Sequence, residues 1–193
     1  QPFFVRKPDP KPTLPIFVLE HWPEVELITY LDADIFFFAD PAPIFAELGE
    51  GSIAVVRQRV SPPHQQTSID KFGVFTVSWV SFRRDASGWA CLHWWRERCL
   101  EWCFNRFEDN KHGDQKYLDD WPVRFSNVIV LEHKGADLAR WNVNNYQIRV
   151  VDANTVIVDE QPLIFYHFSG LTQIAPGLYN PRFGEDIRSP DTL

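Results

Sequence analysis

The chain is organised around residues 26–38, which read ELITYLDADIFFF. Its first part is β-branched, aliphatic or aromatic, which predicts a buried strand that runs directly into Asp32 and Asp34. Alternate side chains of a strand share a face, so these two carboxylates are expected on one side if the strand geometry continues. Such a pair suits a hard divalent cation. The plainer interpretation is a strand that ends in turn-forming aspartates.

Helices and short strands alternate on both sides of this stretch. A helix is predicted to start with Asp40 as N-cap and Pro41 at its first position, and a longer one is predicted over residues 86–107. Residues 61–70 are polar and are predicted to be a loop. Further strands are predicted at residues 52–57, 72–82, 127–131, 148–151, 155–158 and 163–166. This alternation predicts an α/β domain with a mixed, mostly parallel sheet flanked by helices.

The chain is expected to form one domain between two polar ends. Residues 1–15 hold five prolines and are interpreted as an extended arm or linker. Residues 16–177 are predicted to form the domain, and residues 178–193 a polar tail. The chain starts at Gln1 and has no methionine among its 193 residues. We therefore expect it to be a segment of a longer protein.

Composition excludes several classes of function. The 45% hydrophobic fraction excludes a disordered tail. The formal net charge of -7 argues against a nucleic-acid-binding protein, which needs a basic face. A phosphorylated small molecule remains compatible, because one metal ion or local basic cluster suffices to bind it. No apolar run reaches the roughly 20 residues of a membrane span. The three cysteines lie in one predicted helix, so we expect buried thiols and a cytoplasmic protein.

A third candidate ligand follows the predicted strand at residues 163–166. His167 comes directly after this apolar run, and a neutral imidazole is a common ligand beside carboxylates. The alternative is a hydrogen-bonded core histidine. Gly170 follows closely and permits the backbone to approach a ligand.

Two further segments carry polar side chains that suit a sugar. Asp114 is interpreted either as a helix N-cap or as a positioning group or general base, whereas Asp119 and Asp120 are interpreted as a solvated helix end. Trp141 and Asn142 offer an aromatic face and an amide for a sugar ring and its hydroxyls. A turn rich in asparagine is the equal alternative.

The sequence has no glycine-rich phosphate loop of the dinucleotide or P-loop type. A phosphate group would therefore need a metal ion or basic side chains. Arg83 and Arg84, which follow the strand predicted at residues 72–82, have the bidentate geometry for a diphosphate. The alternative is a strand that ends in solvent.

Taken together, these segments resemble the bacterial GT-A-type glycosyltransferases, most closely the group of glycogenin and the lipopolysaccharide galactosyltransferases. Asp32-Ala33-Asp34 corresponds to their Asp-x-Asp segment, and His167-Phe168-Ser169-Gly170 resembles their late His-x-x-Gly motif. Further matching segments lie in the same order, at residues 80–84, 94–98, 113–118 and 141–142. The likeness runs from about residue 11 to residue 171.

The resemblance implies a nucleotide-diphosphate-sugar donor and a bound Mn2+ or Mg2+. The metal would be held against the diphosphate by Asp32, Asp34 and His167. The resemblance implies that Asp114 and Gln115 are the catalytic candidates and line the donor sugar. Substrate binding is expected from Trp141, Asn142 and Gly170, together with Asp32 and Asp34. The acceptor would be a glycan or a lipid-linked sugar at the inner membrane face. The sequence leaves open whether the chain forms a homodimer.

The chain departs from this family in two places. Related sequences carry an Asn-x-Gly step where this chain has Phe75-Thr76-Val77-Ser78-Trp79. The portion that grips the base and ribose precedes the Asp-x-Asp in complete members, so we expect that portion to be absent here. Two other functions therefore stay open. One is an inactive fragment or binding module that keeps the fold, and the other is a metal-dependent phosphohydrolase that uses the same carboxylates with water as acceptor.

Overall fold

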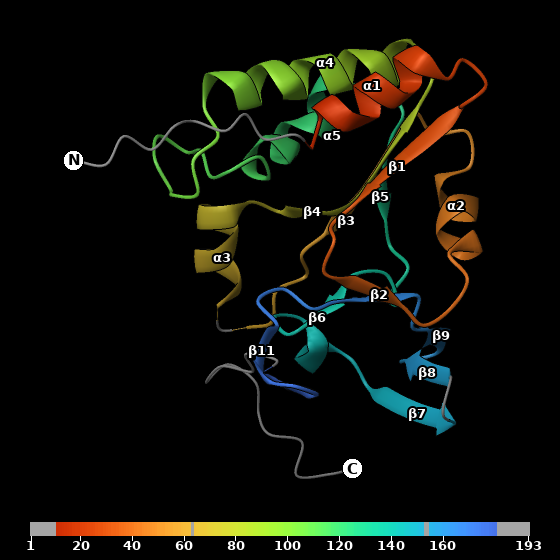
Figure 1. Cartoon of the computed structure of the whole chain (residues 1–193), viewed down its shortest axis with the longest axis vertical. Helices are drawn as coiled ribbons and strands as arrows, with labels where there is room; N and C mark the ends of the chain where they lie inside the picture. The colour runs from red at the N-terminus through yellow and green to blue at the C-terminus, as the bar shows by residue number, and fades with distance from the viewer. Residues whose placement is uncertain (1–10, 63, 153–154, 181–193) are drawn as a thin grey trace.

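The computed structural model describes residues 11–62, 64–152 and 155–180. Its centre is a four-stranded sheet in the order β1-β4-β3-β5 (Figure 1). β4 pairs antiparallel with β1 and β3, and β3 pairs parallel with β5. The bounds are β1 (Leu27–Leu31), β3 (Ile53–Arg57), β4 (Phe75–Arg83) and β5 (Val128–Leu131). The sequence predicted a strand at each of these four places, and the structure confirms all four.

A second, three-stranded sheet has the order β2-β10-β6, in which β10 is antiparallel to β2 and parallel to β6. Antiparallel strands β7, β8 and β9 and the hairpin β11–β12 complete the strands of the described part. Their bounds are β2 (Ile35–Phe37), β6 (Leu138–Ala139), β7 (Ile148–Asp152), β8 (Thr155–Val158), β9 (Gln161–Pro162), β10 (Phe165–His167), β11 (Thr172–Ala175) and β12 (Leu178–Asn180).

The prediction of a mixed α/β fold is confirmed, but the prediction of a mostly parallel sheet is wrong. In the described residues, only β3 with β5 and β6 with β10 pair in parallel. Parallel neighbours need a long crossover connection, whereas a short turn such as the one between β8 and β9 allows only antiparallel pairing.

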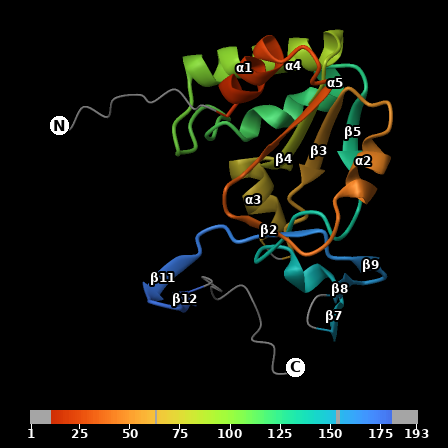
Figure 2. The same ribbon diagram turned by 45° about the vertical axis from the view of Figure 1, so that its right-hand side comes forward.

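Helices cover both faces of the main sheet. α1, α4 and α5 lie together on one face and α2 lies on the other (Figures 1 and 2). The sequence of β3 is continuously apolar because both faces of the strand are buried: Ile53 and Val55 pack into the first core, on one face, and Ala54 and Val56 into the second core, on the other. The helices are α1 (Thr13–His21), α2 (Ala42–Leu48), α3 (Gln65–Phe72), α4 (Ala86–Glu101) and α5 (Trp121–Arg124), with 3-10 turns η1 (Lys116–Asp120) and η2 (Val143–Asn145).

Large aromatic side chains fill both cores. In the first core, Trp95 and Trp121 are fully buried and meet edge to face at 5.3 Å between ring centroids. In the second core, Trp79 of β4 stacks on Phe165 of β10 at 5.7 Å. Since β4 and β10 belong to different sheets, this stack holds the second sheet against the main one. Cys91 and Cys99 are buried free thiols, as predicted. The prediction is wrong for Cys103, which lies beyond the end of α4 and is only half-buried.

Several boundaries differ from the prediction. α3 occupies most of the stretch that was predicted as a loop, because it buries none of its residues and so shows no apolar stripe in the sequence. α1 begins at Thr13, inside the predicted arm, and residues 1–10 of that arm lie outside the described residues. α4 ends at Glu101, before the predicted end. β12 lies in the predicted polar tail, and residues 181–193 lie outside the described part.

Candidate metal and substrate site

The Asp-x-Asp segment links the two sheets. Asp32 follows β1 of the main sheet and donates its backbone N–H to the Ser78 carbonyl of β4, at 3.1 Å. Asp34 precedes β2 of the second sheet. The register of β10 on β2 pairs His167 with Ile35, and the Phe168 N–H donates to the Asp34 carbonyl at 2.8 Å. This pairing brings His167 to the two aspartates although it lies far from them in the chain.

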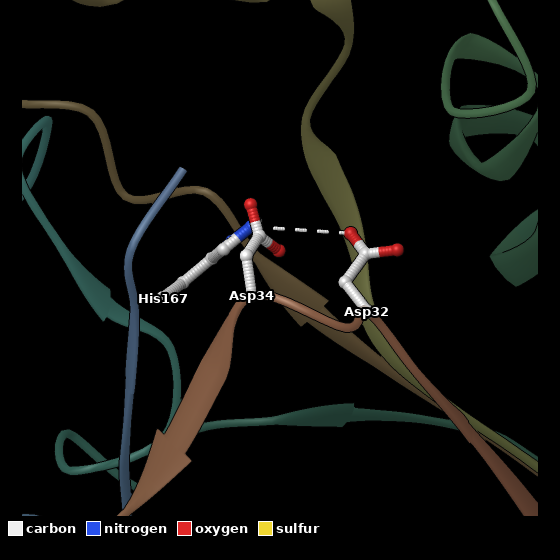
Figure 3. Close-up of side chains that lie close together, drawn as sticks. All are labelled: Asp32, Asp34 and His167. Carbon is white, nitrogen blue, oxygen red and sulfur yellow. Dashed lines mark ion pairs between the residues drawn. The ribbon is translucent and has the colours of Figure 1, made fainter. Parts of the chain in front are cut away.

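The three side chains converge at the point where the sheets meet (Figure 3). His167 Nε2 lies 3.1 Å from Asp34 Oδ1 and 3.9 Å from Asp32 Oδ2. One ligand atom from each residue lies within 4.8 Å of the others. His167 is buried and Asp34 is exposed, so the group opens to solvent on one side. Two carboxylates and an imidazole in this arrangement could hold a divalent metal ion.

Asp137 is a site residue that the sequence reasoning missed. It is fully buried, directly before β6, and its Oδ1 lies 3.4 Å from His167 Nδ1. Ser78 donates its hydroxyl to the same oxygen at 2.7 Å. A carboxylate behind the second ring nitrogen is the usual support of a metal-binding histidine. A lone aspartate between apolar segments carries no sequence signal for this role.

The charges around His167 act on its pKa in opposite directions. Burial lowers the pKa of the imidazole, but Asp137, Asp34 and Asp32 together outweigh burial and raise it. The protein alone therefore favours the protonated ring more than water does. A metal ion at Nε2 would take the place of that proton.

Lys11 joins the metal group to Asp114. Its Nζ lies 3.3 Å from Asp32 Oδ1 and 3.1 Å from Asp114 Oδ2. Burial lowers the pKa of Lys11, but the two carboxylates outweigh it and raise the pKa above its ordinary value. Tyr30 donates its hydroxyl to Asp32 Oδ1 at 3.0 Å. Lys11 escaped the sequence reasoning because it lies in the stretch interpreted as an arm.

A cavity of about 870 Å³ contains this group in its wall. Besides the metal group, the wall includes the predicted substrate residues Asp114, Gln115 and Trp141. Gln115 is held in place by a 3.1 Å hydrogen bond that its side chain donates to the Phe72 carbonyl. The Trp141 ring meets the His167 ring edge to face at 5.2 Å. The volume is within the range of small-molecule sites.

Asn142 does not reach this cavity. Its side chain is fully buried, its oxygen accepts the Ala139 N–H, and its nitrogen donates to the carbonyls of Gln58 and Asp137. Both N–H groups of the amide and its oxygen are thus bonded within the protein. The prediction that Asn142 contacts the sugar is wrong; it shapes the loop that carries Asp137 and Trp141.

Gly170 forms a turn at the edge of the site. It is exposed and has a φ of 80°, a left-handed conformation that favours glycine. The neighbouring Ser169 lines the cavity. Gly170 therefore lies next to the cavity, in the turn that follows His167.

The arginine pair at the end of β4 ties loops together. Arg83 donates to the carbonyls of Gly51 and Gly49, and Arg84 donates to those of Val25, Leu19 and Trp22. The diphosphate interpretation of both arginines is therefore wrong.

The two aspartates at the end of η1 differ from each other. Asp119 is half-buried, accepts the Val74 N–H at 2.7 Å and pairs with Lys116 at 3.2 Å. The prediction of a solvated helix end is confirmed for Asp120, which is exposed and pairs with Arg124. The prediction of a solvated helix end is wrong for Asp119, whose carboxylate holds the backbone at Val74 in place.

Comparisons with known proteins identify two relatives by sequence. The chain is 41% identical over 164 residues to the uncharacterized protein YfnF of Bacillus subtilis (strain 168), and 36% identical over 172 residues to YfnD of the same strain. The matches cover 81% and 88% of this chain but 54% and 55% of the relatives. The chain thus spans about half the length of these curated relatives. No family model matches the chain.

A solved structure supports the fold. The chain is similar to the crystal structure of a glycosyltransferase involved in the glycosylation of the major capsid of PBCV-1, with a TM-score of 0.58 and 14% sequence identity. The similarity covers 89% of this chain and 75% of that one. No described helix has the length and apolarity needed to cross a membrane. The fold is glycosyltransferase-like, and its cavity carries an Asp-Asp-His group that could bind a metal ion.

Proposed function

We propose that this chain carries the metal and donor site of a GT-A-type glycosyltransferase that moves a hexose from a nucleotide-diphosphate sugar to a glycan or lipid-linked acceptor. One observation carries the proposal. His167 is distant in sequence from Asp32 and Asp34, and the three side chains meet in the wall of a large cavity. They do so in a fold that is glycosyltransferase-like.

In this proposal Asp32, Asp34 and His167 would hold Mn2+ or Mg2+, which would supply a Lewis acid for the diphosphate leaving group. Asp137 orients the imidazole through Nδ1, so that Nε2 faces the two aspartates. Trp141 presents its ring beside His167, where an aromatic face suits a sugar ring.

Asp114 is the proposed positioning group for the donor sugar. It lies 3.1 Å from the Lys11 ammonium, which also contacts Asp32. The ion pairs place the Asp114 carboxylate at a defined distance from the metal group. Gln115, fixed by its bond to Phe72, extends the same wall of the cavity. Residues 16–177 are proposed as the domain, with Lys11 just before it completing the site. We propose that it acts on the cytoplasmic side of the membrane.

The first test measures donor binding. UDP-, GDP-, ADP- and dTDP-sugars are added to the chain with and without Mn2+, and its melting temperature is recorded. A donor at 100 times its Kd adds about 2.7 kcal/mol of stability. We expect one nucleotide class to stabilise the chain only when metal is present.

Asp34→Asn is expected to abolish this metal-dependent stabilisation, because it removes a ligand charge. Asp120→Asn removes an exposed carboxylate of the same type and is expected to change nothing. Equal responses of the two variants would contradict the site. Release of sugar 1-phosphate and nucleoside monophosphate, in which water has cleaved a P–O bond of the diphosphate, would indicate a phosphohydrolase. Metal-dependent binding without any turnover would indicate a binding module.

A further inference from the structure

Arg140 has an unusual environment for an arginine beside a cavity. Its Nε is buried without a hydrogen-bond partner. Within residues 11–62, 64–152 and 155–180, no group forms a hydrogen bond or an ion pair with its side chain. Taking a guanidinium partly out of water without a counter-charge costs free energy. By contrast, Arg83 and Arg84 each donate hydrogen bonds from their guanidinium groups to two or more backbone carbonyls.

The backbone places Arg140 next to the metal group. β6 pairs parallel with β10, and Ala139 lies opposite His167 in this register. Arg140 is the next residue after Ala139, so it emerges at the same edge as the candidate metal ligand. It lines the large cavity together with Asp32, Asp34 and His167.

A second, smaller cavity of about 240 Å³ adjoins the first, and Arg140, His167 and Ser169 line both. Its other walls are mostly aromatic and aliphatic, formed by Phe38, Val143, Tyr166 and Phe168. Arg140 therefore stands at the junction of a polar and an apolar space.

The charges of the site show what Arg140 could bind. A divalent cation would be balanced by the carboxylates of Asp32 and Asp34. A diphosphate that joins a nucleoside to a sugar brings two further negative charges. Lys11 is already shared between Asp32 and Asp114. Arg140 supplies a cation whose planar fork matches two oxygens of a phosphate group.

We propose that Arg140 binds a phosphate group of the substrate beside the metal group. This inference rests on the proposed function, because in that function the phosphate group is part of the donor's diphosphate. A phosphorylated lipid acceptor would present the same chemistry, with its apolar part next to the smaller cavity. The two sources are separated by the probes below.

The test uses isothermal titration of the purified chain with Mn2+ alone, with UDP, GDP, ADP and dTDP in the presence and absence of Mn2+, and with geranyl phosphate. Arg140→Met is expected to weaken diphosphate binding about 10- to 100-fold, the range of a charge-assisted hydrogen bond, and to leave the affinity for Mn2+ unchanged. Arg140→Lys keeps the charge without the fork and is expected to restore part of the loss. Arg149→Met is the matched control, because Arg149 is exposed on β7. Circular dichroism verifies that each variant is folded.

The outcomes separate this inference from the proposed function. Metal-dependent diphosphate binding that is equal in wild type and Arg140→Met overturns the role of Arg140 and leaves the proposed function intact. Diphosphate binding that needs Arg140 but not metal supports Arg140 and contradicts the metal centre. Geranyl phosphate binding that needs Arg140, without diphosphate binding, supports the phosphate site and assigns it to the acceptor. If no phosphate probe binds the wild-type chain, the inference is wrong.

Discussion

Replacing Asp137 with asparagine tests the support of the metal group. The substitution keeps the shape of the side chain and its ability to accept the Ser78 hydroxyl, and removes one negative charge 3.4 Å from His167 Nδ1. At an effective dielectric constant of about 20, a unit charge at 3.4 Å contributes about 5 kcal/mol of gross attraction to an imidazolium. The net value is smaller, because Asp137 is fully buried and its charge is desolvated.

The expected net effect follows from comparable metal sites. Loss of the group behind a metal-binding histidine weakens metal affinity about 10- to 100-fold, which corresponds to roughly 1.4–2.8 kcal/mol. Stability without metal is expected to fall by roughly 1–3 kcal/mol, because the buried imidazole loses one charged neighbour but keeps Asp32 and Asp34. The two quantities should therefore separate: the affinity for Mn2+ falls while the folded state persists.

Isothermal titration with Mn2+ measures the affinity, and urea denaturation measures the free energy of unfolding. Asp120→Asn is the control, because it removes a carboxylate that is exposed and paired with Arg124. Ser78→Ala is a second probe: it removes only the hydroxyl that orients Asp137, so its effect on affinity should be smaller. If Asp137→Asn binds Mn2+ as tightly as the wild type while Asp34→Asn does not bind, Asp137 has no part in holding the metal.

Three further predictions concern stability. Gly135→Ala would push a methyl group into the Pro162 carbonyl oxygen, and is expected to lower the free energy of unfolding by about 1–3 kcal/mol in urea; an equally stable variant would contradict this close approach. Arg84→Met removes the bonds to three backbone carbonyls and should lower the melting temperature without changing Mn2+ affinity, whereas a selective loss of ligand binding would restore the diphosphate interpretation. Burial lowers the pKa of His133; the charge of Glu47 opposes this effect and that of Arg59 adds to it. The Nδ1 atom of His133 accepts the Gly135 N–H. The stability that the neutral ring provides is present above the unfolded pKa of about 6.5 and is lost as the pH falls through the folded pKa. His133→Gln should therefore flatten the fall in unfolding free energy between pH 7 and pH 5. An unchanged slope would refute this assignment.

Local sequence pattern was sufficient for the elements of the main sheet. β3 is an apolar run and β4 a largely apolar one because both of their faces are covered, and such runs are visible without knowledge of the partners. The pattern failed for α3, which buries no residue and so has no apolar stripe to detect. It also failed for strand direction, because pairing depends on contacts between segments that the local pattern does not contain.

The candidate site divides in the same way. Asp32 and Asp34 could be predicted, because two carboxylates embedded in an apolar run are a local signal. Asn142 was misassigned because an exposed and a fully buried asparagine look alike in the sequence; only the structure shows its amide bonded to Gln58, Ala139 and Asp137. Lys11 was hidden in a proline-rich stretch whose end forms part of the cavity wall.

By itself, the sequence determined the strand that ends in Asp32-Ala33-Asp34, the apolar strands beside it and the acidic balance of the chain. These features depend on residues that are neighbours along the backbone. The tertiary structure decided that β10 pairs with β2 in the register that sets His167 beside Asp34, that Asp137 stands behind the imidazole, and that Arg140 follows the residue opposite His167. The physical reason is that strand register is set by hydrogen bonds and packing between distant segments, so the position of a side chain in the site is a property of the assembled sheets.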